Sequence, residues 1–189
     1  LLLNDNRFYL LKIDDLIVET PIGSLLFKFQ ASEGDLSSAS VRASILEPYI
    51  PDGMTVEGCI AVLLRVNPTT PIRDLNFTCS WMNLSIDGSG CTGEALDAWE
   101  WEKNGKLVIV GTEDGDCLGS RLNIEEQIQD NYPVTFLNNC IAINIQEFPE
   151  SKDLTLHYII SWNSLPENID SACWYAVDVA HKKVITACT

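Results

Sequence analysis

Hydrophobic and polar residues alternate along most of the chain, in short segments that end at turn residues. The clearest segment runs from Leu154 to Trp162, where nearly every even-numbered position is apolar. A period of two sends successive side chains to opposite faces of a strand. The even positions are therefore predicted to face a core. His157 is predicted to lie on the opposite face with Thr155 and Ser161, exposed or half-exposed.

A second alternating segment begins at Leu75 and changes phase between Trp81 and Met82. A slip of one residue moves every later side chain to the other face of the strand. We therefore predict either a β-bulge at this point or a strand that crosses from one sheet to another.

A hairpin is predicted around Asn104-Gly105, which separates two runs rich in β-branched and aromatic residues. An Asn-Gly pair in this setting favours a two-residue type I′ turn. Such a turn sets Trp101 opposite Val108. Two residues further from the turn, Trp99 then faces Val110, and aromatic to β-branched pairs of this kind stabilise antiparallel ladders.

The remaining elements are predicted from the same signals. Two further hairpins join 16–20 to 25–29 and 174–179 to 184–187, and additional strands are expected at 8–13, 41–45, 56–66, 134–137 and 141–145. A short helix is predicted over Ile124–Asp130, because Asn123 and Glu126 match a capping box. About ten to twelve strands are too many for one open, twisted sheet. We predict a mainly β fold, an antiparallel β-sandwich or a closed barrel with one short helix, in a single domain over residues 1–189.

Charge narrows the expected partners. The chain has 27 acidic and 12 basic residues, a formal net charge of −15. Such a charge repels phosphate backbones and anionic lipid headgroups. Apolar runs are also far shorter than a membrane-spanning helix requires. We therefore expect no binding to nucleic acid or membranes, and a basic protein is the partner that the charge favours; the oligomeric state is left open.

The seven cysteines are spread without any C-x-x-C pair. Zinc-ribbon and thioredoxin-like motifs are therefore missing from the sequence. The odd number and the apolar surroundings of several cysteines favour free thiols in a reducing cytoplasm. No cofactor is expected.

Cysteine catalysis is one alternative function. Cys91 lies in a glycine-rich turn and Cys117 follows an acidic loop, and a thiol nucleophile needs a nearby base such as His157. His181 adjoins two lysines and is expected to be an exposed turn histidine. A mild alkylator that labels one cysteine near neutral pH would support this alternative.

Two other groups of residues are candidates for ligand binding. Trp162, Asn163, Trp174 and Tyr175 combine large rings with polar edges, a composition that stacks a sugar or anchors a partner. The carboxylates of Glu113, Asp114 and Asp116 form a weak candidate calcium site. A solvated acidic loop is the simpler interpretation of those three residues.

Three functional hypotheses follow. The leading one is a non-enzymatic, acidic interaction domain, similar in role to an inhibitor or immunity protein, that binds a basic partner. The alternatives are a cysteine-dependent enzyme and a β-sandwich that binds a carbohydrate or small ligand.

Overall fold

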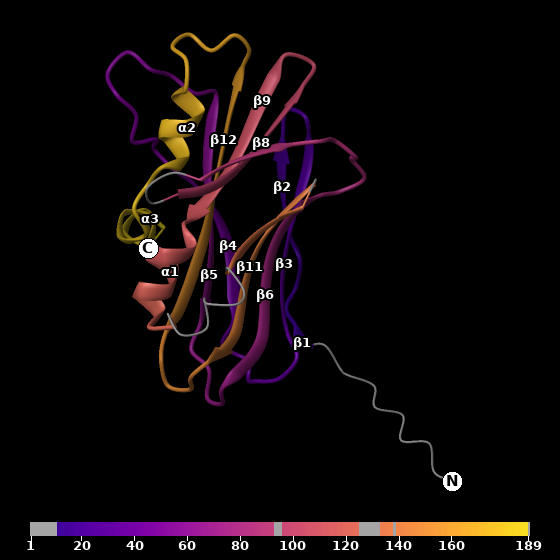
Figure 1. The fold of residues 1–189 in the computed structure, drawn as a ribbon, viewed down its shortest axis with the longest axis vertical. Coiled ribbons are helices and arrows are strands. Elements are labelled where there is room, and N and C mark those ends of the chain that lie inside the picture. Colours follow the sequence, from indigo (N-terminus) through magenta and orange to yellow (C-terminus); the bar gives the residue numbers. More distant parts are fainter. Residues whose placement is uncertain (1–10, 93–95, 125–132, 138, 189) are drawn as a thin grey trace.

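The computed structural model describes residues 11–92, 96–124, 133–137 and 139–188 of the chain. Most of these residues belong to two antiparallel sheets that face each other, and three short helices lie on one side (Figure 1). The sheets do not close on each other into a barrel. The predicted β-sandwich is therefore confirmed, and the closed barrel is not.

The first sheet has the strand order β1-β3-β6-β11-β10, and β2 also pairs with β3. Its strands are β1 (Leu11–Lys12), β2 (Leu16–Thr20), β3 (Gly23–Ala31), β6 (Ile72–Trp81), β10 (Val134–Leu137) and β11 (Cys140–Phe148). The second sheet has the order β4-β5-β12-β9-β8-β7. Its strands are β4 (Ser40–Ile45), β5 (Gly58–Val66), β7 (Ser89–Thr92), β8 (Leu96–Lys103), β9 (Lys106–Glu113) and β12 (Leu154–Ser164).

The main core fills the space between the sheets. The ring of Tyr158 packs against those of Phe27 and Phe77, with centroids 5.7 and 5.0 Å away. Its hydroxyl donates a hydrogen bond of 2.7 Å to the carbonyl oxygen of Phe77 on the opposite sheet. Leu156 and Ile160 are buried in the same cluster. The inward orientation predicted for the even positions of β12 is thus confirmed.

The hairpin of β8 and β9 has the predicted register. Trp101 lies opposite Val108, and Trp99 lies opposite Val110. The two residues of the Asn-Gly turn have positive φ angles of 53° and 72°, as a type I′ turn requires. The hairpin of β2 and β3 is also confirmed, with Thr20 opposite Gly23.

The phase change after Trp81 marks the end of β6. Asn83 has a left-handed φ of 55°, which turns the chain away from the strand. The next strand, β7, belongs to the second sheet. The chain therefore crosses between the sheets as predicted, but through a non-strand segment and without a bulge.

The first helix does not begin where the sequence suggested. Helix α1 spans Gly115–Leu122, and the Asp114 side chain accepts hydrogen bonds from two backbone N–H groups of its first turn. Asn123 is the C-cap of this helix, with a φ of 58°, so its predicted role as an N-cap is wrong. The rest of the predicted helix, residues 125–130, lies outside the described residues.

The hairpin predicted for 174–179 and 184–187 is also wrong. Two helices stand there, α2 (Ala172–Val177) and α3 (His181–Ala187). Both lie against the outer face of the second sheet, the face turned away from the first sheet (Figure 1). The buried residues of α2 pack there with apolar residues of β5, β9 and β12 in a second cluster. Helical spacing brings these residues to one side, which a strand could not do.

None of the helices in the described part of the chain is long and apolar enough to cross a membrane.

Candidate metal centre

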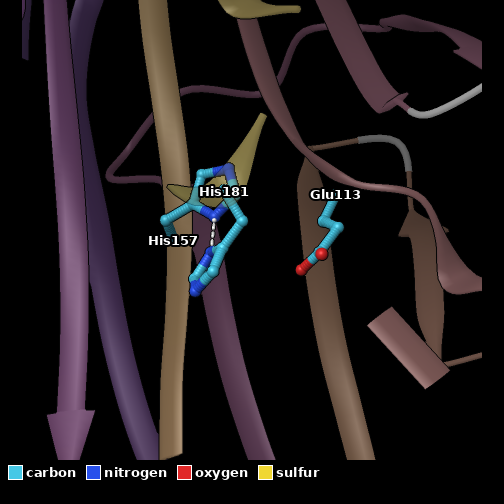
Figure 2. Close-up of side chains that lie close together, drawn as sticks. All are labelled: Glu113, His157 and His181. Carbon is cyan, nitrogen blue, oxygen red and sulfur yellow. Dashed lines mark hydrogen bonds between the residues drawn. The ribbon is translucent and has the colours of Figure 1, made fainter. Parts of the chain in front are cut away.

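Three side chains that can ligate a metal ion meet beneath α3. Glu113 is the last residue of β9, His157 lies within β12, and His181 is the first residue of α3. One ligand atom of each lies within 4.8 Å of the others. Figure 2 shows the two imidazole rings in contact and the Glu113 carboxylate beside them.

The strand register explains this convergence. His157 is opposite Leu63 of β5 and points, like Ile159, to the outer face of the second sheet. Ile159 is opposite Gly111 of β9. Continuing the antiparallel register by two residues brings Glu113 opposite His157. Helix α3 then places His181 above the two strands.

The two histidines are joined directly. Nδ1 of His157 lies 2.7 Å from Nδ1 of His181, and Nε2 of His181 lies 2.9 Å from Oγ1 of Thr155. When the Nε2–H group of His181 donates to Thr155, its Nδ1 atom is free to accept a hydrogen bond from His157. With this tautomer, the Thr155 hydroxyl holds His181 with a lone pair directed at His157.

The prediction that His157 is exposed or half-exposed is wrong. Only 2% of its surface is accessible, because α3 and the ring of His181 cover it. Burial lowers the pKa of His157 well below its ordinary value of 6.5, and the nearby His181 and Arg121 add to this effect. Burial, together with Arg121, lowers the pKa of His181 to about 4. Both imidazoles are neutral at neutral pH, which is the form that binds metals.

Arg121 of α1 holds the third ligand. Its Nε lies 3.0 Å from both carboxylate oxygens of Glu113, and its Nη2 lies 2.8 Å from Oε2. Nη2 also donates to the carbonyl oxygen of Thr155 at 3.0 Å. Because a carboxylate offers about four lone-pair positions, Glu113 can bond to Arg121 and still ligate a metal. Hydrogen bonds of this kind commonly orient metal ligands in proteins.

Two imidazoles and a carboxylate suit a divalent transition metal such as Zn²⁺. A tetrahedral ion with bonds of about 2 Å would hold two nitrogen atoms about 3.3 Å apart. The imidazoles would therefore separate slightly, and the metal would replace the proton that they share.

Cys117, one of the two cysteines proposed as nucleophiles, is not among the three clustered ligands. Cys117 is exposed on α1. A hydrogen bond with Asp114, burial and nearby carboxylates raise its pKa to about 11. A thiol with this pKa is almost entirely protonated at neutral pH, which disfavours attack by a thiolate. The side chain of Cys91 is outside the described residues.

The acidic residues 113–116 have separate structural roles. Oδ1 of Asp114 accepts hydrogen bonds from the backbone N–H groups of Asp116 and Cys117, at 2.8 and 2.9 Å. Asp116 lies in the first turn of α1, where a negative charge is favourable. Glu113 instead pairs with Arg121. The calcium site suggested by these three carboxylates stays a prediction.

The aromatic candidates are divided between the two faces of the second sheet. Trp162 packs against the main core, whereas Trp174 packs against the cluster beneath the helices. Asn163 is buried, and its amide donates to the carbonyl oxygen of Thr55 at 2.9 Å. Tyr175 is 47% exposed. The four residues therefore do not present one stacking surface.

His181 and Arg121 were not identified as site residues from the sequence. His181 has no spacing relationship to His157 that marks a metal site, and its turn-like surroundings favoured an exposed side chain. Searches of protein-family models, of curated proteins and of solved structures found no match to this chain.

Proposed function

We propose that this protein binds a divalent transition metal ion, of the Zn²⁺ type, through Glu113, His157 and His181. The observation that supports this proposal most strongly is the convergence of three ligand atoms within 4.8 Å from three separate elements. Thr155 and Arg121 orient two of the three ligands from outside. The arrangement thus includes the outer hydrogen bonds that metal sites usually have.

The burial of the site favours a structural role for the metal. His157 is 2% exposed, and the side chain of Glu113 is 11% exposed. Helix α3 has seven residues and no side-chain hydrogen bond at its N-cap. Helices this short are not stable in isolation, so tertiary contacts must hold them. A metal bound to His181 would tie the first turn of α3 to β9 and β12.

The proposal can be tested with Zn²⁺ and with Co²⁺, whose visible absorption reports the coordination geometry, and with NMR of the histidine rings, which reports imidazole ligation. The chain contains only two histidines, and both belong to this site. Any imidazole ligation therefore reports on His157 and His181 alone. We expect one equivalent of Zn²⁺ to shift both histidine ring signals in NMR spectra and to displace Co²⁺.

Matched variants distinguish metal binding at this site from metal binding at exposed carboxylates. His181→Ala and Glu113→Gln should each weaken Zn²⁺ binding strongly. Glu33→Gln is the control, because Glu33 also pairs with an arginine, Arg73, but on the exposed surface. The proposal is wrong if His181→Ala binds Zn²⁺ as tightly as the wild type, or if Mg²⁺ competes equally well.

A second proposal concerns the acidic interaction surface. Residues 45–52 begin at the last residue of edge strand β4 and expose two large apolar side chains, Ile45 at 90% and Tyr49 at 52%. The exposed Glu47 and Asp52 lie between and after them. Apolar anchors bordered by charge are typical of protein interfaces. We propose that this segment binds a basic protein partner, and the free thiols of the described cysteines support a reducing, cytoplasmic setting.

The second proposal predicts that binding of the partner depends on the side chains of residues 45–52. Ile45→Ser and Tyr49→Ser should abolish the capture of a basic protein that wild-type protein retains at low salt. Retention of the same protein by both variants would show that general charge attraction, and not this segment, is responsible.

A further inference from the structure

Two arginines lie side by side on the outer face of the second sheet, next to the C-terminal end of α3. Arg42 is in edge strand β4, and Arg65 is in the neighbouring strand β5. Ser40 is opposite Arg65, and Arg42 is opposite Leu63. Arg42 and Arg65 are therefore diagonal neighbours on one face, within reach of each other's long side chains.

Neither arginine has an acidic partner among the described residues. Arg73, Lys106 and Arg121 each form an ion pair with a glutamate. In contrast, Nε and Nη2 of Arg65 are buried and have no hydrogen-bond partner. Arg65 is half-buried, and N–H groups that have lost their water and gained no acceptor are unfavourable. In a chain with a net charge of −15, acidic residues far outnumber basic ones, so two neighbouring arginines without an acidic partner are unexpected.

Two cavities adjoin Arg65. The larger has a volume of about 530 Å³, and residues that line it include Ser38, Ser40, Arg65, Asn67, Asp153 and Thr155. The smaller has a volume of about 130 Å³ and is lined by Ser40, Arg42, Leu63, Arg65 and Cys188. The larger volume is within the range of pockets that bind small molecules. Arg65 and Ser40 border both cavities, so a ligand group in either cavity can contact these two residues.

We propose that these cavities bind a small molecule through an oxyanion, a phosphate or carboxylate group, held by Arg65, Arg42 and the Ser40 hydroxyl. The edge of a guanidinium formed by Nε and one Nη atom matches two oxygen atoms of such a group. Because Nε and Nη2 are buried in the structure, the Arg65 side chain would rotate on binding to turn these N–H groups toward the cavity. The bound oxyanion then supplies the acceptors that Arg65 lacks within the protein.

Asp153 limits which ligands the site accepts. Its carboxylate lines the larger cavity and is exposed. Because it repels a second negative charge, the site favours a ligand with one anionic group at Arg65 and a neutral or positive remainder near Asp153. None of the three proposed metal ligands lines either cavity, although Thr155, which bonds to His181, and Ile185 of α3 line the larger one.

The test is titration with inorganic phosphate and with acetate, followed by NMR or calorimetry, with chloride as a reference for unspecific charge effects. Arg42→Gln and Arg65→Met should each weaken binding about tenfold or more. Asp153→Asn should strengthen binding about threefold by removing a repulsive charge. Arg73→Gln, which removes an exposed arginine from the other sheet, should leave binding unchanged. A metal chelator should leave anion binding unchanged, which separates this site from the metal.

Three results would overturn the proposal. The first is that neither phosphate nor acetate shows saturable binding at millimolar concentration. The second is that chloride competes as well as either oxyanion, or that Arg73→Gln weakens binding as much as Arg42→Gln. The third is that Asp153→Asn weakens binding. Arg42 is exposed on an edge strand, so Arg42→Gln and Asp153→Asn decide the question even if Arg65→Met does not fold.

Discussion

Zinc should stabilise the folded protein by an amount that disappears when His181 is replaced. A ligand that binds only the folded state adds about 2.7 kcal/mol to the free energy of unfolding when its free concentration is 100 times its dissociation constant. In a domain of this size, each kcal/mol shifts the melting temperature by about 2–4 °C. Saturating Zn²⁺ should therefore raise the melting temperature of the wild type by about 5–11 °C.

The variant His181→Ala changes both the melting temperature without metal and the increase in melting temperature that Zn²⁺ produces, and the two effects must be measured separately. Without metal, it removes the contacts of His181 with His157 and Thr155, which are 2.7 and 2.9 Å long. Leaving a buried polar group of His157 without a partner costs about 1–3 kcal/mol. The variant should therefore melt at a lower temperature even in the absence of Zn²⁺. The informative quantity is the increase that Zn²⁺ produces in each protein, measured against its own metal-free state.

Thermal unfolding followed by circular dichroism, with and without Zn²⁺, measures both quantities. We expect the increase in the wild type and in Glu33→Gln, and none in His181→Ala or Glu113→Gln. A chelator should reverse the increase. The reasoning would be refuted by equal increases in the wild type and in His181→Ala, since the stabilising metal would then bind elsewhere on the protein.

Other predictions test the fold and its electrostatics. Tyr158→Phe should lower the free energy of unfolding by about 1 kcal/mol, measured by urea denaturation, because it removes the hydroxyl that donates to Phe77 across the core. Asp114→Ala should cost about 1 kcal/mol by the same assay, because it removes the cap of α1, while Asp114→Asn should cost less. Hydrogen bonds from Thr69 and Ser37 lower the pKa of Asp35 to about 2. Their contribution to stability is present above pH 3.8 and is lost as the pH falls toward 2. In Thr69→Val, NMR titration should show the pKa of Asp35 closer to 3.8, and an unchanged pKa would contradict this cause.

The strand pattern could be predicted from the sequence because it depends on local properties. Alternation within β12 identifies which side chains face the core, and the register of the β8–β9 hairpin follows from two turn residues. These features depend on residues that are close in sequence, so tertiary packing does not need to be known.

The C-terminal helices could not be predicted in the same way. Residues 172–187 are short, partly apolar runs with few helix signals, and neither α2 nor α3 has a side-chain hydrogen bond at its N-cap. Their helical form is decided by packing. The outer face of the second sheet carries apolar residues, whose burial from solvent is favourable. Helix α2 packs against them with four buried residues on one side. Tertiary contacts of this kind override weak local preferences.

The sequence by itself determined a mainly β fold of antiparallel strands, a formal net charge of −15 and the direction in which His157 points from its strand. Only the tertiary structure decided that His157 is buried and that it meets His181, which is 24 positions away, and Glu113. The physical reason is that alternation sets the face of a side chain but not what covers that face. The β9–β12 register and the docking of α3 determine that cover, and both arise from contacts between residues far apart in the chain.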